Sequence, residues 1–208
     1  MYLSRLVLNP RSRQVQRENV NVYQLHRTVM RAFPEELPAE ERVLFRLETA
    51  PRTGVPTLLV QSISQPDWEW LAELPQQGYL LPLADEPNPW VKPFEPAFTA
   101  GQRLVFRLRA NPTVKRVGKR HGLYREDQQL DWLQRQARQG GFTVEAARTQ
   151  DRGYVEGYTR QQHKLRLLTV QFDGVLRVDN PDQFQQTLRA GIGPGKGLGL
   201  GMLSVAPV

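Results

Sequence analysis

The residues best suited to chemistry lie near the start of the chain, in the segment VYQLHRTVMR. His26 follows Tyr23 by three residues, so a helix would place an imidazole and a phenol next to each other on one side, with Arg27 and Arg31 beside them. Histidine exchanges protons near neutral pH and guanidinium groups offset phosphorane charge, which together suit phosphodiester cleavage. A half-buried tyrosine and histidine on an ordinary helix would show the same spacing, so these residues alone leave both interpretations open.

The distribution of charge predicts where an anionic partner would bind. The chain has 208 residues and a net charge of +7. Residues 1–90 carry 9 basic and 11 acidic side chains, a net of −2, whereas residues 91–208 carry 19 and 10, a net of +9. Nucleic acid is the first partner to expect for such a basic half, although a generally basic surface is the alternative. There is no cysteine, so disulfides and thiolate metal sites are excluded, and no obvious carboxylate pair suggests a metal-dependent nuclease. Neither a signal sequence nor a spanning helix is indicated, and we expect a cytoplasmic protein that requires no cofactor.

Two basic segments in the second half could hold that partner. A predicted β-hairpin places cations where they could enter or flank the groove of an RNA stem, unless it is an ordinary solvated hairpin: Arg160, Lys164 and Arg166. The loop NPTVKRVGKRHGLY has four certain cations in seven residues beside two glycines, which predicts a flexible phosphate clamp or a contact with a partner subunit: Lys115, Arg116, Lys119 and Arg120.

Glycine occupies every odd position from Gly191 to Gly201. Alternate residues of an extended chain point to opposite sides, so this pattern predicts a final strand with one bare face and apolar side chains on the other. RNA or the first helix would then lie close to the bare face, unless the segment is a packed structural strand or a mobile tail. The expected contacts with RNA are Gly193, Gly195, Lys196 and Gly197. The spacing fits neither a Walker loop nor a dinucleotide-binding fingerprint, which argues against nucleotide binding.

The order of predicted elements indicates an α+β protein of two tandem ferredoxin-like βαββαβ domains. In the first half, a strand near residues 2–9 precedes a helix over 21–33, strands over 42–49 and 55–62, a short helix over 66–74 and a strand over 78–84. A proline-rich linker over 85–101 follows. Residues 102–208 repeat the order, ending in the glycine-rich strand. The predicted domains are therefore 1–84, carrying the helix of His26, and the basic 102–208.

Several separated segments resemble the CasE family, the endoribonuclease that processes CRISPR repeat RNA in the Cascade complex. They are LVLNP, YQLHRTVMRAF, RLRANPTVKRVGKRHG and GIGPGKGLGLGMLSVAP. The resemblance implies cleavage of precursor CRISPR RNA 3′ of the repeat hairpin, without a metal, by attack of the adjoining 2′-hydroxyl. The products would be a 2′,3′-cyclic phosphate and a 5′-hydroxyl. It also implies that His26 and Tyr23 are the catalytic residues, that the guide RNA is retained, and that other Cascade subunits are partners. A catalytically inactive RNA-binding subunit of the same fold is the alternative, and a basic scaffold protein is a third.

Overall fold

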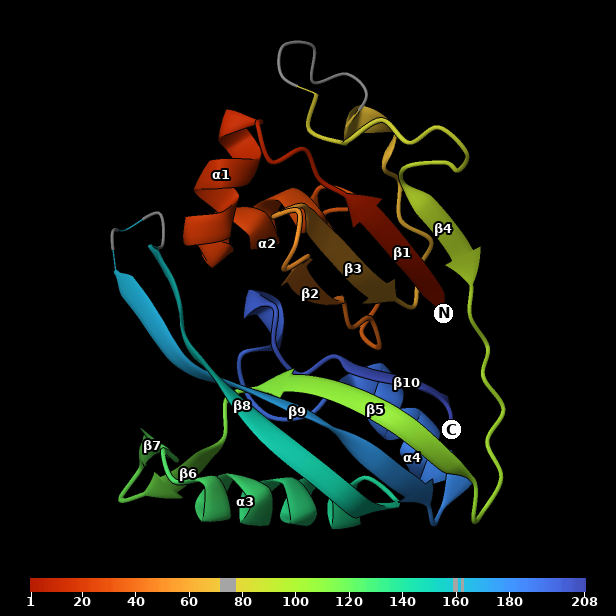
Figure 1. Cartoon of the computed structure of the whole chain (residues 1–208), viewed down its shortest axis with the longest axis vertical. Coiled ribbons are helices and arrows are strands. Elements are labelled where there is room, and N and C mark those ends of the chain that lie inside the picture. Colours follow the sequence, from red (N-terminus) through yellow and green to blue (C-terminus); the bar gives the residue numbers. More distant parts are fainter. Residues whose placement is uncertain (72–77, 159–160, 162) are drawn as a thin grey trace. The chain divides into compact units, whose positions relative to one another are not determined.

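The structure is a computed structural model that describes residues 1–71, 78–158, 161 and 163–208 (Figure 1). The chain forms two compact units. The first unit comprises Met1–Glu95, Glu156–Leu165 and Gly197–Gly199, and the second comprises Pro96–Val155, Arg166–Lys196 and Leu200–Val208. Two short segments from late in the sequence therefore pack with the first half of the chain.

The first unit is built on a four-stranded antiparallel sheet with the strand order β2-β3-β1-β4. This order, in which the last strand lies beside the first, is that of a ferredoxin-like fold and confirms the predicted fold. The elements are β1 (Tyr2–Val7), α1 (Arg13–Val20), α2 (Val22–Met30), β2 (Leu44–Thr49), β3 (Pro56–Ser62), the 3-10 helix Glu69–Leu71 and β4 (Trp90–Pro93).

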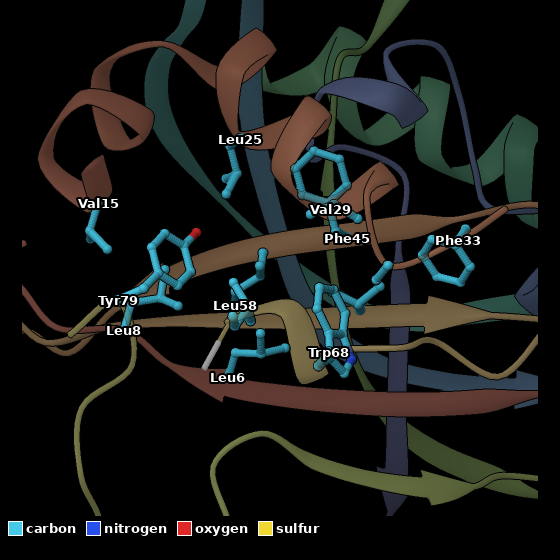
Figure 2. Close-up of a cluster of buried hydrophobic side chains, with 13 residues drawn as sticks. Leu6, Leu8, Val15, Leu25, Val29, Phe33, Phe45, Leu58, Trp68 and Tyr79 are labelled. Carbon is cyan, nitrogen blue, oxygen red and sulfur yellow. The ribbon is translucent and has the colours of Figure 1, made fainter. Parts of the chain in front are cut away.

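The core of the first unit lies between the sheet and the two helices (Figure 2). α2 contributes Leu25 and Val29, which are 1% and 0% exposed. They pack in one cluster with Phe45 of β2 and Leu58 of β3. The apolar positions of α2 recur at helical spacing, so one face of the helix is buried and its edge is left for other side chains.

The first unit differs from the predicted elements at three places. The polar stretch after β1 forms α1, which the sequence analysis did not predict. The prediction of a strand over 78–84 is wrong, because Leu80 forms only an isolated bridge with Leu8. The fourth strand is β4, which lies inside the segment predicted as a linker. Of the helix predicted over 66–74, only Glu69–Leu71 is helical, as a 3-10 helix, whereas residues 66–68 are not, and residues 72–74 lie outside the described residues.

Asn88 explains why the chain reaches the sheet edge later than predicted. Its side-chain oxygen accepts from the Val7 amide at 2.9 Å, and its side-chain nitrogen donates to the carbonyls of Val7 and Leu81 at 2.7 and 2.8 Å. The amide satisfies the end of β1 as a neighbouring strand would. Such a contact between residues 81 positions apart leaves no periodic signal in the sequence.

The second unit repeats the topology with the strand order β10-β5-β9-β8. Its core includes Leu108, Leu133, Phe172 and Phe184, all at most 1% exposed. The elements are β5 (Arg103–Ala110), β6 (Thr113–Arg116), β7 (Lys119–Gly122), α3 (Glu126–Gln139), β8 (Phe142–Tyr158), β9 (Lys164–Val178), α4 (Pro181–Ala190), the 3-10 helix Lys196–Leu198 and β10 (Leu203–Pro207). The basic loop predicted after β5 is thus a short hairpin, β6–β7.

The glycine-rich segment is not the predicted extended strand, because only Leu203–Pro207 is a strand. Five of its glycines have φ between +72° and +85°, a conformation that other residues rarely adopt: Gly191, Gly193, Gly195, Gly199 and Gly201. The backbone turns repeatedly and is tied back by bonds such as that from the Gly201 amide to the Arg109 carbonyl, 2.7 Å. The alternation therefore reflects alternating left-handed positions, and not one bare face of a strand.

No helix among the described residues is long and apolar enough to cross a membrane.

Replacement of Gly174 by alanine tests the close approach of the β8 backbone to this residue of β9. A Cβ at this position would lie 2.0 Å from the Ala146 carbonyl oxygen, so the backbone must move. We expect Gly174→Ala to lower the free energy of unfolding by about 3 kcal/mol, as overpacking does, in chemical denaturation. Gly153→Ala is the control, because Gly153 has φ +72° but a Cβ built there would meet no atom within 4 Å, and it should lose only ~1 kcal/mol. Equal losses would contradict the steric account.

Candidate functional site

The α2 helix presents His26 at the edge of its buried face. The imidazole is half-buried and lies nearly parallel to the Phe45 ring, with the ring centroids 6.3 Å apart and an angle of 24°. Burial lowers the pKa of His26 below its ordinary value of 6.5. The ring is therefore largely neutral near pH 7 and can accept a proton.

Tyr23 lies one turn before His26, as its spacing predicts. The two ring centroids are 6.5 Å apart and the rings are tilted by 39°. Both side chains are half-buried, so each keeps an accessible edge while its backbone is fixed by the helix. The structure therefore places the phenol and the imidazole that the sequence analysis singled out next to each other on α2.

A buried carboxylate on α1 helps to fix the position of α2 through a hydrogen bond. Glu18 is 4% exposed and accepts from the Thr28 hydroxyl at 2.5 Å, the Tyr79 hydroxyl at 2.6 Å and the Gln14 amide at 2.9 Å. Burial raises the pKa of Glu18, although its hydrogen bonds act in the opposite direction. Three donors on one acid join α1, α2 and the chain at Tyr79, and Figure 2 shows the Tyr79 ring beside Val15 of α1.

Part of the glycine-rich segment lies against the imidazole. A Cβ built on Gly197 would stand 3.6 Å from His26 Cε1 and 3.7 Å from Nδ1, which is ordinary van der Waals contact. A side chain there would therefore cover this edge of the ring. Gly199, with φ +78°, would meet the Phe45 ring at 3.1 Å. Glycine thus admits the backbone beside both rings of the stacked pair.

The end of β8 meets the start of α2 through one side chain. Asn21 Oδ1 accepts from the Tyr23 amide, as a helix cap, and from the Tyr158 amide, each at 3.2 Å. A Cβ on Gly157 would lie 2.8 Å from the same oxygen. The sequence analysis did not assign Gly157 and Tyr158. A glycine inside a strand often marks close backbone approach, and this was the available signal.

Arg27 of α2 and Arg31, the residue that follows α2, are both exposed. The Arg31 guanidinium carbon lies 3.9 Å from the centre of the Trp70 ring, within cation–π distance. The indole thus holds one cation near the first turn after α2, and Arg27 projects one turn earlier. Trp70 is a further residue that the sequence analysis did not assign.

The remaining predicted cations lie in different parts of the molecule. On the β6–β7 hairpin of the second unit, four side chains are exposed: Lys115, Arg116, Lys119 and Arg120. Arg166 of β9 stacks on Tyr154, 3.8 Å from the ring centre. Lys164, in a segment that packs with the first unit, is 3.5 Å from Glu156. Arg160 lies outside the described residues.

Packing accounts for two of the glycines predicted to contact RNA. A Cβ on Gly193 would lie 2.8 Å from Trp132, and one on Gly195 would lie 3.0 Å from both Leu167 and Leu200. Both also have positive φ. Lys196, between Gly195 and Gly197, has a polar or electrostatic contact within the fold.

Across residues 1–71, 78–158, 161 and 163–208, no group of three or more histidine, aspartate and glutamate side chains could hold a metal ion.

Acidification tests the environment of His26. The pKa of His26 is lower in the folded chain than in the unfolded chain, so the unfolded chain binds a proton at this imidazole more readily. The free energy of unfolding therefore falls as the pH drops from 6.5, the ordinary pKa, through the lowered pKa of the folded chain. We expect His26→Gln to lose less stability than the unsubstituted chain between pH 7.5 and pH 5 in urea denaturation. The comparison cancels groups common to both chains, including Glu18. Identical pH profiles would contradict a half-buried imidazole with a lowered pKa.

Three comparisons with known proteins identify the family of this chain. The family model described as CRISPR associated protein matches residues 1–207. The CRISPR-associated endoribonuclease Cse3 of Thermus thermophilus is 40% identical, and the CRISPR system Cascade subunit CasE of Escherichia coli is 27% identical, each over the whole of both chains. A solved structure of Thermus thermophilus Cse3, bound to an RNA representing a pre-cleavage complex, has a TM-score of 0.84 and 40% identity. It covers 99% of this chain and 98% of its own. The match along the full length and the shared fold show that this chain belongs to the CasE family of CRISPR-associated proteins.

Proposed function

We propose that this chain is an endoribonuclease that binds the hairpin of CRISPR repeat RNA and cleaves the precursor RNA 3′ of the stem. The observation that carries the proposal is the half-buried imidazole of His26, with its lowered pKa, beside Tyr23. The chain is also similar over its full length to an endoribonuclease. Imidazole can serve as an acid or a base in this chemistry.

The proposed reaction is attack by the 2′-hydroxyl of the ribose next to the scissile phosphate. The 2′-hydroxyl loses its proton, its oxygen bonds to phosphorus, and the bond from phosphorus to the 5′-oxygen breaks. That oxygen takes up a proton, giving a 2′,3′-cyclic phosphate and a 5′-hydroxyl. His26 would supply or accept one of these protons. Its lowered pKa favours the neutral ring and therefore suits the base in the first step.

The scissile phosphate would be contacted by Tyr23 and by the guanidinium groups of Arg27 and Arg31. The Tyr23 hydroxyl, on the turn next to His26, would orient the 2′-hydroxyl or a phosphate oxygen. Arg27 and Arg31 are exposed guanidinium groups close in sequence to the imidazole and would offset the charge that develops on phosphorus. Glycine at position 197 leaves the neighbouring ring edge uncovered for the substrate.

We propose that the two predicted domains divide the work. Residues 1–84 would carry out the cleavage, and the basic residues 102–208, after the linker 85–101, would hold the RNA. The four exposed cations of β6–β7, Arg160, Lys164, Arg166 and the glycine-rich segment with Gly193, Gly195 and Lys196 would contribute to that binding. The similarity to CasE, named a Cascade subunit, supports retention of the guide RNA and delivery to other Cascade subunits in the cytoplasm.

Replacement of His26 by alanine should abolish cleavage without abolishing binding. We expect the cleavage rate to fall about 10²-fold or more, the size typical of a lost acid or base, while affinity for the repeat hairpin is retained. The assay uses the repeat RNA in EDTA and follows two fragments, one ending in a cyclic phosphate. Gln24→Ala, at an exposed position on the same helix, is the control.

Full activity of His26→Ala would remove this residue from the mechanism. Loss of cutting in EDTA would contradict metal independence. RNA that is bound but left intact by the unsubstituted chain would support the catalytically inactive RNA-binding subunit instead.

Removal of two hairpin cations should change the salt dependence of RNA binding. We expect the double variant Lys119→Ala, Arg120→Ala to weaken affinity and to flatten the slope of log affinity against log salt by about 1–2. Binding releases fewer counterions when fewer phosphates are contacted. The cut site should not change. The control is Arg135→Ala with Arg138→Ala, which removes two exposed cations from α3 in the same unit. Unchanged salt slopes for the hairpin variant would exclude phosphate contact there.

A further inference from the structure

Two exposed tyrosines and an exposed arginine form a cluster in the second unit. Tyr124 follows β7 and is 67% exposed, and Tyr154 of β8 is 42% exposed. The guanidinium carbon of Arg166, on β9, lies 3.8 Å from the centre of the Tyr154 ring. Three flat side chains from separate parts of the sequence thus meet at one place on the surface.

The cluster is organised by its own contacts. A side-chain hydrogen bond with Tyr154 is the main cause that raises the pKa of Tyr124, and Arg166 acts in the opposite direction. Scattered aromatic residues on a surface need no explanation, but rings fixed by a mutual hydrogen bond and a stacked cation leave little freedom to lose when another ring arrives. The cluster is therefore preorganised.

The cationic hairpin β6–β7 adjoins the cluster. A Cβ on Gly122, the last residue of β7, would lie 3.3 Å from Tyr124 Cζ, so glycine leaves room for the phenol to fold against the end of the hairpin. The hairpin exposes four cations within a few residues of this contact. Aromatic surface and positive charge next to each other are the two components of sites that bind single-stranded nucleic acid.

The tip of the hairpin is also unusual. Val117 is fully exposed and has φ +46°, a conformation that β-branched residues rarely adopt. An apolar side chain held there, among four cations, contacts no core. The tip of the hairpin is therefore both apolar and basic.

The acidic residues that follow the β6–β7 hairpin most closely in sequence already form hydrogen bonds within the fold. Asp127, at the start of α3, accepts from Arg125 at 2.8 and 3.1 Å. Glu126 accepts from the Thr149 hydroxyl at 2.7 Å. Their negative charge is thus tied to neighbouring donors, while the hairpin cations remain exposed to a polyanion.

We propose that Tyr124, Tyr154 and Arg166 form a stacking site for an unpaired base of the bound RNA, whose phosphates the β6–β7 hairpin holds. This inference rests on the proposed RNA-processing function and adds a site for single-stranded RNA next to the repeat hairpin. Arginine and tyrosine planes stack on every base, so the site would be tolerant of sequence. The basic charge of the hairpin favours RNA over a protein surface as the occupant.

The test compares two RNAs in equilibrium binding measured by fluorescence anisotropy. One is the repeat hairpin with unpaired nucleotides on both sides, carrying a 2′-deoxyribose at the cut so that it stays intact. The other is the same stem trimmed of its unpaired nucleotides. We expect Tyr124→Ala to weaken binding of the first RNA about tenfold and that of the second less than twofold. Tyr124→Phe keeps the ring and should bind both RNAs within twofold of the unsubstituted chain.

Tyr154→Ala with Arg166 unchanged is a second variant and should show the same selective loss. Equal losses for both RNAs, or none for either, would overturn the stacking site. So would unchanged RNA binding together with lost association with other Cascade subunits, which would make the cluster a protein interface.

Cleavage of the all-ribose RNA is measured separately, so that the two proposals can fail independently. Selective loss in Tyr124→Ala without any cutting by the unsubstituted chain would support the stacking site and refute the proposed cleavage. Cutting by the unsubstituted chain, with no selective loss in Tyr124→Ala, would do the reverse.

Discussion

Burial of one face of α2 against the first sheet is the constraint on which the candidate site depends. Leu25 and Val29 are almost fully buried, and burial of such side chains contributes about 2 kcal/mol each. Once these two side chains are fixed in the core, Tyr23 and His26 have to emerge along the edge of the same helix. The stacked Phe45 ring then gives the imidazole a partly apolar environment and thereby its lowered pKa.

Local pattern was sufficient to predict the elements that carry this arrangement. The order of predicted elements, which includes the helix now seen as α2, predicted the ferredoxin-like topology, and the sheet orders confirm it. The same helical spacing placed Tyr23 beside His26, because residues three apart on a helix are neighbours whatever surrounds them. Their catalytic roles remain a proposal.

Long-range contacts account for what the sequence did not reveal. β4 forms at 90–93 because Asn88 binds the end of β1, and Gly157 is required because β8 returns to the cap of α2. The glycine-rich segment was misjudged for a related reason. Alternating glycine fits an extended strand and a series of left-handed turns equally well, and only the packing of Trp132, Leu167 and Phe45 against the backbone distinguishes the two.

The shared acceptor at the start of α2 has a consequence for the electrostatics of the site. Asn21 serves the backbone amides of Tyr23 and Tyr158 with a single oxygen. An aspartate would satisfy both amides and would interact more favourably with the positive end of the helix dipole. It would also place a full negative charge about one turn from the imidazole, where the proposed cleavage brings a polyanion. The neutral carboxamide provides the cap without adding this negative charge. Under the proposed function, the residue type at position 21 is therefore constrained by the charge of the RNA as well as by the fold.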